Sequence, residues 1–462
     1  MGLDTENDYH SLEALPSKKD IENKEGSRES MKVLGFWQVV FTVTNGMIGP
    51  VILVVPYSFA LVGVHGWIMY AFAFFMFWFT GHCLYRAQMS RPGSMLYQSY
   101  PEIGGGLLGP RGRSAIGLSI TVELIGLCAA FVVIVGDNLV KVQPLLYLFG
   151  VELNKTSWIL AFTACVLPTV LMQNYGVLAD MSKIGVVVCF SIPVIVIGSH
   201  IINPVTNYYA PEDIVIEGPG FNYENLPLAL GIVSVAYTTH AIFPTVVARM
   251  KHIEEFPRVL QLSFGAVTAF YLLAGAGFYL YGKSTDPQIT FNLPESSQLL
   301  ISYAIIVTIF LKFALMLNPV ILELEEIALK NPTLRRWLVQ MDARSSFSSS
   351  KAATTATMSP NTKRAIPSIR LFLVGCTVGT AVVVPYIALI HSAVGIFWST
   401  CVCVVIPCIL ALQLRDWSSF ERMIIWTLMV FGILIMIVGL YQNVLNIYRC
   451  YNGTNEINNM CN

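Results

Sequence analysis

An apolar stretch at residues 37–62 carries polar side chains next to glycine and proline. Thr44 and Asn45 precede Gly46, and Gly49 follows within one turn, directly before a proline. Proline has no N–H for the helical ladder, and glycine adds no side chain that would block a ligand. Unwound backbone at membrane depth is tolerated only where it lines a cavity or is buried in protein. The pattern predicts a ligand site on bared backbone groups, unless the stretch is a kinked helix with glycine at a tight crossing.

A second interrupted stretch, at 226–248, contains Ser234, Tyr237, Thr238 and His240 shortly before a proline. Polar groups at membrane depth must face a partner or a cavity. Interruptions at corresponding positions of two halves of a membrane protein point to the binding site of a transporter. His240 is either a hydrogen-bonding residue between helices or a carrier of protons, and the sequence leaves both roles open.

Two charged side chains lie inside other apolar stretches. Glu123 is about a third of the way into 114–140, and Lys312 is midway along 298–328. A charge at the centre of a bilayer costs about 2.5–3.5 kcal/mol on insertion scales, so both side chains should be paired or solvated. They could pair with each other for structural reasons, or they could couple transport to an ion.

Membrane-spanning helices are needed to position these residues. Hydrophobic residues make up 55% of the chain and charged residues 12%, against about 25% charged residues in soluble domains. This composition excludes a water-soluble globule, and the net charge of zero argues against a nucleic-acid partner. About 20 apolar residues cross a bilayer. Eleven stretches of that kind lie near 37–62, 66–86, 114–140, 157–174, 182–203, 226–248, 259–282, 298–328, 369–391, 393–413 and 420–448.

The positive charges predict the orientation of the chain. If the N-terminus is cytosolic, most of the 28 Lys and Arg residues fall on the cytosolic side, as the positive-inside rule requires. The glycosylation sequons at Asn154 and Asn452 then face the other side. Cys450 and Cys461 lie on that side as well, where they could form a disulfide in an oxidising compartment or remain free thiols.

The chain is predicted to hold one membrane domain between two tails. Residues 1–35 have the composition of a disordered cytosolic tail, 36–449 form the transmembrane domain with a cytosolic linker at 329–367, and 450–462 form a lumenal or extracellular tail. The first five stretches and the next five share a layout that opens with an interrupted helix, and they start on opposite sides. This predicts an all-α membrane protein with a LeuT-like five-plus-five inverted repeat and one extra helix.

No pattern in the sequence indicates enzyme chemistry. Residues 104–109 match GxGxxG, but the motif follows no strand and opens no βαβ unit, so we expect a flexible connector and no dinucleotide site. The sequence also lacks metal-ligand spacing, a nucleophile elbow and a P-loop, so we predict neither a cofactor nor ATPase activity. Transport would then draw on a gradient of an ion or solute.

Several motifs are similar to those of the amino acid/auxin permease family, in particular its vesicular, vacuolar and proton-coupled members. The resemblance extends over nearly all eleven stretches. The motifs that carry it are Val43-Thr44-Asn45 with Gly49 and Pro56-Tyr57, Gly66-Trp67, Tyr100-Pro101-Glu102-Ile103-Gly104 with Gly112-Arg113, Glu123-Leu124, Gly136-Asp137-Asn138, His240-Ala241-Ile242-Phe243-Pro244 and Asn292-Leu293-Pro294.

This resemblance implies an eleven-helix, LeuT-like secondary transporter of amino acids that is usually coupled to protons. The residues it implies for binding the amino and carboxylate groups of the substrate are Thr44, Asn45, Gly46 and Gly49, with Ser234, Tyr237 and Thr238 opposite. Pro50 departs from the small or apolar residue that the family commonly has there. Sodium-coupled relatives form an ion site with a hydroxyl-bearing eighth helix, whereas Lys312 in the middle of that helix favours protons over sodium.

We therefore predict a transporter that moves neutral amino acids with protons by alternating access, with the amino acid, protons and the lipid bilayer as its partners. The alternative is a nutrient sensor that binds an amino acid with little flux. A channel is disfavoured because the helices offer few pore-lining charges. Tyr9-His10-Ser11-Leu12 fits a tyrosine-type sorting signal, so a lysosomal, vacuolar or vesicular membrane is favoured over the plasma membrane.

Overall fold

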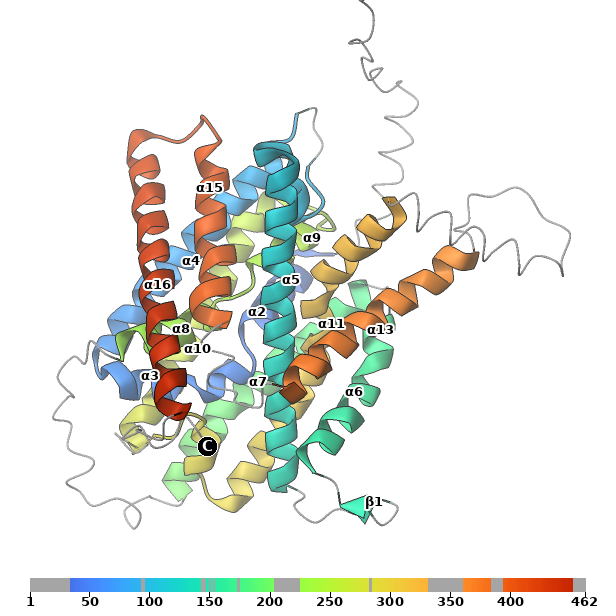
Figure 1. Ribbon diagram of the computed structural model, residues 1–462. Helices are drawn as coiled ribbons and strands as arrows, with labels where there is room; N and C mark the ends of the chain where they lie inside the picture. Colours follow the sequence, from blue (N-terminus) through green and yellow to red (C-terminus); the bar gives the residue numbers. More distant parts are fainter. Residues whose placement is uncertain are drawn as a thin grey trace, which may run out of the picture.

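The apolar stretches form a bundle of helices in the computed structural model (Figure 1). The structure describes residues 34–92, 96–142, 147–148, 151–152, 154–172, 175–202, 225–281, 285–330, 360–383 and 394–451. Residues 1–33 of the predicted N-terminal tail, most of the predicted linker and everything beyond residue 451 lie outside the described residues.

Within the described ranges, eight helical segments are long and apolar enough to cross a membrane. Those assigned as single helices are α4 (His65–Met89), α5 (Tyr100–Val142), α7 (Tyr175–Ile202), α10 (Phe256–Tyr281), α11 (Glu295–Lys330) and α16 (Ser419–Tyr451). Shorter apolar helices are α6 (Lys155–Leu171) and the second half of α13 (Pro360–Val383). One feature was not expected from the sequence, a small antiparallel hairpin of β1 (Tyr147–Leu148) and β2 (Val151–Glu152).

Both interruptions predicted from glycine and proline are present. The first stretch is divided into α2 (Phe36–Met47), the short 3-10 helix η1 (Pro50–Leu53) and α3 (Val55–Val62). The sixth is divided into α8 (Leu226–Ala236), the 3-10 helix η3 (His240–Ile242) and α9 (Phe243–Val247). Prolines stand at the start of η1 and in the first turn of α9, where a missing N–H removes no helical hydrogen bond.

A third irregular stretch was not predicted. Two π-helical turns, η8 (Val394–Ser399) and η9 (Cys401–Val405), run into α15 (Ile406–Leu412). π-helical turns are rare and are found frequently at functional sites. η8 packs against α8 and α5, so this stretch lies between the second interrupted helix and the centre of α5.

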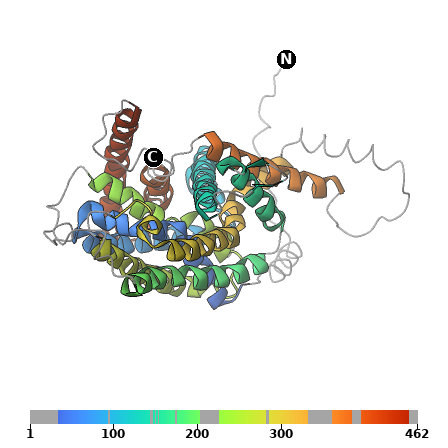
Figure 2. The same cartoon turned by 90° about the horizontal axis from the view of Figure 1, so that it is seen from below.

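The interrupted helices lie inside the bundle. α2 packs on α7 and α10, while α11 packs on α7 and α5. Figure 1 shows α15 and α16 on one side of the bundle and α6 and α13 on the other, with α5 running between them. Seen from below in Figure 2, α13 (orange) reaches outward from the remaining helices.

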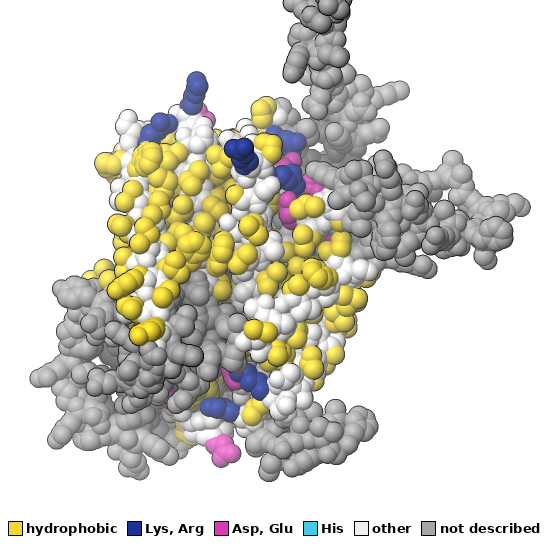
Figure 3. Space-filling view, in the orientation of Figure 1, with side chains coloured by type: hydrophobic (Ala, Val, Ile, Leu, Met, Phe, Trp, Pro, Cys, Tyr) yellow, Lys and Arg dark blue, Asp and Glu magenta, His cyan; other side chains and the backbone are white. Residues whose placement is uncertain are grey.

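The outer surface has the polarity of a membrane protein. In Figure 3 hydrophobic side chains cover much of the middle of the face in view, and basic and acidic side chains lie mainly toward the two ends of the bundle. On α16 the exposed apolar residues include Phe420, Met423, Trp426, Ile437 and Tyr441, and α16 is the least buried of the candidate spans. Such a surface would be unfavourable in water and fits contact with lipid acyl chains.

The expectation of a flexible connector at 104–109 was wrong. These residues are helical as the first part of α5, which turns at Gly109 with φ of 78° directly before Pro110. A Cβ at Gly104 would meet the side chain of Ile116 and the backbone of Gly112, so the glycines allow the two parts of α5 to pack closely.

Candidate functional site

The ammonium group of Lys312 lies inside the break of the first interrupted helix. Its Nζ donates hydrogen bonds to the carbonyl oxygens of Gly46, at 3.2 Å, and Ile48, at 2.9 Å. The last carbonyls of a helix lack intrahelical partners and carry partial negative charge. A fully buried cation therefore neutralises the C-terminal end of α2, and Gly49 provides the space because a Cβ there would collide with Nζ.

Tyr271 of α10 joins the two interrupted helices. Its hydroxyl lies 3.0 Å from the carbonyl oxygen of Met47 and 2.8 Å from that of Ala236, so it can donate its single hydrogen to either. Met47 is the last residue of α2 and Ala236 is the last residue of α8. Tyr271 was not predicted as a site residue, because a single tyrosine in a long apolar helix carries no pattern of its own.

Several buried polar atoms close to the first break have no hydrogen-bond partner among the described residues. They include the Thr44 hydroxyl, the Oδ1 atom of Asn45 and the Thr239 hydroxyl. Asn45 is held on its other side, since its Nδ2 donates to the Ser182 hydroxyl at 3.3 Å. Buried polar atoms in proteins are nearly always satisfied, so such orphans suggest a missing ligand or water. An amide oxygen and two hydroxyls can accept from an ammonium group, and the hydroxyls can also donate to a carboxylate.

The two breaks touch each other at Gly46. A Cβ on Gly46 would overlap the Thr239 hydroxyl and would lie 3.1 Å from Ile242, so only glycine allows this approach. Thr239 lies in the gap between α8 and η3. Thr238 was predicted at the site and Thr239 was not, although the structure brings Thr239 against the first helix.

The predicted residues of the sixth stretch make contacts mostly within the protein. The Thr238 hydroxyl donates to the Ser234 carbonyl at 2.8 Å, and the Ser234 hydroxyl accepts from Thr400 at 3.3 Å. Tyr237 shares a 2.7 Å hydrogen bond with Thr268. The ring of Tyr237 also stacks between Phe77 and Phe264, so in this structure it is part of an aromatic cluster.

His240 is buried among aromatic rings on the far side of the second break. Its Nε2 lies 3.1 Å from the Phe77 carbonyl and 3.1 Å from the Thr80 hydroxyl. A carbonyl can only accept, so we assign a hydrogen to Nε2 and leave Nδ1 as an acceptor with no hydrogen-bond partner in the described structure. This geometry is that of a neutral imidazole that links α4 to η3.

Glu123 does not pair with Lys312. Neither carboxylate oxygen has a hydrogen-bond partner among the described residues, and the side chain is fully buried. It faces Ser399 of η8 instead. The two intramembrane charges predicted from the sequence therefore belong to different places in the fold.

At the beginning of α7, one tyrosine ties several helices together. The Tyr175 hydroxyl of α7 lies 3.2 Å from the Thr245 hydroxyl of α9 and accepts from Asn318 of α11 at 2.8 Å. The guanidinium group of Arg249 lies 4.0 Å from the centre of its ring. Beside this cluster, Gln38 of α2 donates to Asp180 of α7 at 3.3 Å, so both interrupted helices are held at this end.

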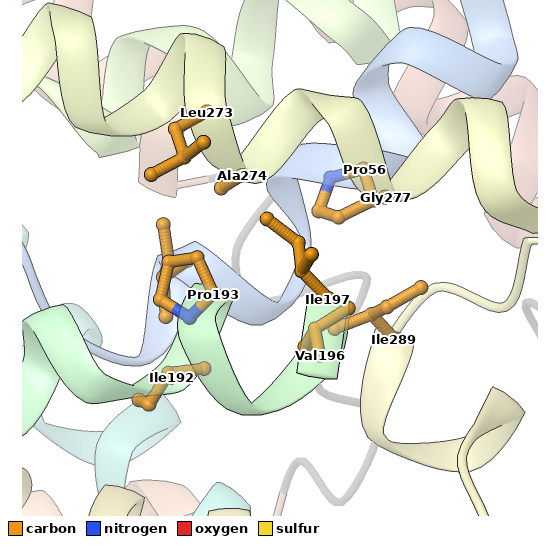
Figure 4. A pocket seen from close by; sticks show the side chains of 10 residues that line it. Pro56, Ile192, Pro193, Val196, Ile197, Leu273, Ala274, Gly277 and Ile289 are labelled. Atoms are coloured by element: carbon orange, nitrogen blue, oxygen red, sulfur yellow. The ribbon is translucent and has the colours of Figure 1, made fainter. Parts of the chain in front are cut away.

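Two clefts adjoin the interrupted helices. The first, of about 260 Å³, lies between α3, α7 and α10 and has an entirely apolar lining (Figure 4). It offers no partner for an ammonium or carboxylate group. The second, of about 280 Å³, lies between α5, α9 and α11, where Thr121, Thr245 and Glu323 provide polar groups.

The predicted modification sites are only partly described. Asn154 is exposed and caps α6, because its Oδ1 accepts from the Ser157 N–H at 2.9 Å. Asn452 and Cys461 lie outside the described residues, and Cys450 is described only as a backbone position at the end of α16. Within the described part of the chain, no group of three His, Cys, Asp or Glu side chains could hold a metal ion.

Comparison with known proteins gives a consistent result. Residues 32–445 match the family described as "Transmembrane amino acid transporter protein". The chain is 27% identical over 421 residues to "Amino acid transporter AVT1E" of Arabidopsis thaliana, and the aligned region covers 88% of this chain and 73% of that protein. It is 23% identical over 423 residues to the human "Vesicular inhibitory amino acid transporter", covering 90% and 75%. The fold is similar to a solved Na⁺-coupled sialic acid symporter, with a TM-score of 0.51 at 12% identity over 90% of each chain.

Proposed function

Because the chain belongs to the transmembrane amino acid transporter family, the amino acid/auxin permeases, we propose that it is a proton-coupled secondary transporter of neutral amino acids. The two interrupted helices meet at Gly46, where the Thr239 hydroxyl lies without a hydrogen-bond partner among the described residues. Substrate binding at this meeting point would connect both helices. Opening and closing on alternate sides of that point would move the amino acid across the membrane.

The observation that carries the coupling proposal is the position of Lys312. Unwound carbonyls in broken membrane helices are the groups that coordinate a sodium ion in many transporters. Here the carbonyls of Gly46 and Ile48 already bind an ammonium group. A second cation about 4 Å away would be repelled by about 4 kcal/mol at an effective dielectric constant of 20. The site therefore disfavours sodium and has its positive charge supplied by the chain.

The substrate's charged ends fit the unpartnered atoms of the site. We assign the amino group to the Asn45 Oδ1 atom and the Thr44 hydroxyl, and the carboxylate to the Thr239 hydroxyl, which lies against Gly46. Ser234, Tyr237 and Thr238 form the wall opposite. Tyr237 and Thr238 would join the site only after the helices move, since their side chains now bind neighbouring residues.

A neutral side chain suits the surroundings of the site. Lys312 is the cation among the described site residues at the two breaks, and its ammonium group is already bonded to two carbonyls. His240 is a neutral ring bonded to α4. A charged substrate side chain would find no free partner of opposite sign in this group, and its burial would be costly.

The remaining parts of the proposal concern architecture and place. We infer eleven spans, with α2–α3 as the first and α16 as the extra helix after a five-plus-five inverted repeat. The charges then put the N-terminus in the cytosol and the C-terminus in the lumen or outside, together with the sequons at Asn154 and Asn452 and the pair Cys450 and Cys461. A vacuolar, lysosomal or vesicular membrane is supported by the sorting signal and by a relative that is vesicular by name.

Uptake by the purified protein in liposomes tests this function. Radiolabelled neutral, acidic and basic amino acids are offered with an imposed pH gradient, in sodium buffer and in choline buffer. We expect accumulation of neutral amino acids that follows the pH gradient and is the same in both buffers. Accumulation that needs sodium and ignores the pH gradient would contradict the coupling, and binding without flux would favour a sensor.

A further inference from the structure

Glu123 is a buried carboxyl group that the binding site does not use. It lies near the middle of α5, is fully buried, and neither of its oxygens has a hydrogen-bond partner among the described residues. The Ser399 side chain of η8 faces it, but the Ser399 hydroxyl also makes no hydrogen bond of good geometry. Two adjacent unsatisfied polar side chains inside a membrane protein need an explanation.

No cation faces this carboxyl group within the described structure. The titratable groups close enough to interact with its charge are Tyr100, from the beginning of α5, and Cys401 and Cys403 of η9. The Tyr100 hydroxyl is committed to the Val402 carbonyl at 2.8 Å. The nearest element with an intramembrane cation is α11, and its Lys312 is bound in the break of the first helix.

An ionised carboxylate cannot be stable in these surroundings. A buried charge without a partner costs far more than a buried neutral group, and the carboxyl group avoids this cost by binding a proton. Glu123 is therefore a neutral acid in the arrangement seen here. The carboxylate form requires either water or a donor that moves toward it.

One cleft is lined by residues of α5 close to Glu123. The cleft of about 280 Å³ between α5, α9 and α11 is lined by Ile120 and Thr121 of α5 and by Glu323 of α11, among mostly apolar residues. Ile120 precedes Glu123 by three residues, which places it about one helical turn away on the same face. The cleft thus ends one turn from the carboxyl group, at the side of the bundle that the charge distribution assigns to the cytosol.

The carboxyl group is linked to the second interrupted helix through η8 and η9. Next to Ser399, Thr400 donates to the Ser234 hydroxyl of α8 at 3.3 Å. Two residues farther along from Cys401, Cys403 faces the backbone of Thr239 and His240 in the break itself. A change of charge on Glu123 would therefore act on a short irregular stretch that contacts the substrate site.

We propose that Glu123 is the residue that binds the transported proton. The carboxylate takes up one proton from the side of higher proton concentration, stays neutral while the breaks are closed as seen here, and releases the proton into the cleft between α5, α9 and α11. No other bond is made or broken. The assignment rests on the proposed proton coupling and specifies the side chain and the route.

Glu123→Gln tests the assignment because the amide has the shape of the neutral acid and cannot exchange a proton. Purified protein in liposomes is measured in two assays: accumulation of a neutral amino acid driven by a pH gradient, and exchange of internal for external amino acid without a gradient. A pH gradient of about one unit supports about tenfold accumulation with one proton per substrate, since one unit corresponds to about 1.4 kcal/mol. We expect Glu123→Gln to keep exchange and to lose accumulation and substrate-induced proton movement.

The matched control is Glu254→Gln, which makes the same chemical change at an exposed position outside the bundle. It should keep both exchange and accumulation. Accumulation and proton movement by Glu123→Gln at the wild-type level would overturn the assignment, and so would loss of exchange together with accumulation. A wild type that moves no protons with its substrate would overturn the proton coupling and this assignment together.

A second variant covers the case in which Glu123→Gln cannot be purified. Glu123→Asp keeps the acid and shortens it by one methylene. We expect it to move protons with the substrate, with a pH profile of uptake displaced from that of the wild type. A superimposable pH profile would show that the local environment of this carboxyl group does not govern coupling and would overturn the assignment.

Discussion

Replacing Lys312 by methionine is expected to weaken the closed arrangement of the first interrupted helix. Methionine keeps most of the length and the apolar stem of lysine but removes the ammonium group. The carbonyls of Gly46 and Ile48, which now accept at 3.2 and 2.9 Å, would be left without these donors. The C-terminal end of α2 would also lose the positive charge that compensates its dipole.

The size of the effect follows from the two carbonyls. A buried acceptor without a partner costs about 1–3 kcal/mol, so the two together give about 2–6 kcal/mol. The lower end of this range, about 2 kcal/mol, corresponds to about a 30-fold change in an equilibrium constant. We therefore expect a clearly lower melting temperature and a loss of uptake of at least that order for Lys312→Met.

The assay combines thermal unfolding of purified protein in detergent with uptake in liposomes. Lys251→Met serves as the control, because Lys251 is exposed and the substitution makes the same chemical change outside the bundle. The wild type and the control are expected to melt at the same temperature in sodium and choline buffers. Lys312→Met, with vacant carbonyls, is expected to gain some stability from sodium.

Two results would refute this reasoning. Unchanged melting temperature and uptake in Lys312→Met would mean that the ammonium group does not stabilise the break. A melting temperature of the wild type that rises specifically with sodium would mean that the break binds an ion in addition to the ammonium group.

Three other predictions follow from the contacts of the breaks. Gly46→Ala should reduce uptake by about tenfold or more, because the new Cβ overlaps the Thr239 hydroxyl and overpacking costs about 1–3 kcal/mol. The control Gly198→Ala should transport normally, because a Cβ at Gly198 would have no other atom within 4 Å. Tyr271→Phe should lower the melting temperature, since a helix-end carbonyl loses its donor at a cost of about 1–3 kcal/mol; an unchanged melting curve would exclude this bridge. Tyr175→Phe keeps the ring under Arg249 but removes the hydroxyl that joins α7, α9 and α11. A cysteine introduced in the adjoining cleft by Val320→Cys should therefore be alkylated faster in Tyr175→Phe than with Tyr175 present. Equal rates would contradict a role of this hydroxyl in closing the cleft.

The sequence predicted the parts of the fold that depend on local composition. Length and hydropathy were sufficient to locate the helices, because a membrane helix needs a long apolar run. The two interruptions were predicted correctly because proline and glycine weaken a helix at their own positions. The count of eleven spans stays a prediction, since α6 and α13 are short and an interrupted helix has no single length.

Contacts between distant residues could not be predicted. Lys312 was identified as an unusual charge, but its partners lie 266 and 264 residues away in the sequence and are backbone carbonyls, which carry no sequence signal. Pairing it with Glu123 was a reasonable expectation from charge alone, yet the helices place the two side chains apart. Tyr271 and Thr239 were missed for the same reason, since their importance comes only from what they touch.

The separation of the two buried ionisable groups suggests a division of roles. Lys312 is bonded to both carbonyls of the break, so losing its proton would weaken two charge-assisted hydrogen bonds that hold the site together. Its charge is therefore best suited to remain constant through the cycle and to replace a bound cation. A transporter that draws energy from protons still needs a group that changes charge, and Glu123 has no partner that would be lost when it does so. If this division holds, variants of Lys312 should impair exchange and accumulation together, whereas Glu123→Gln should separate them.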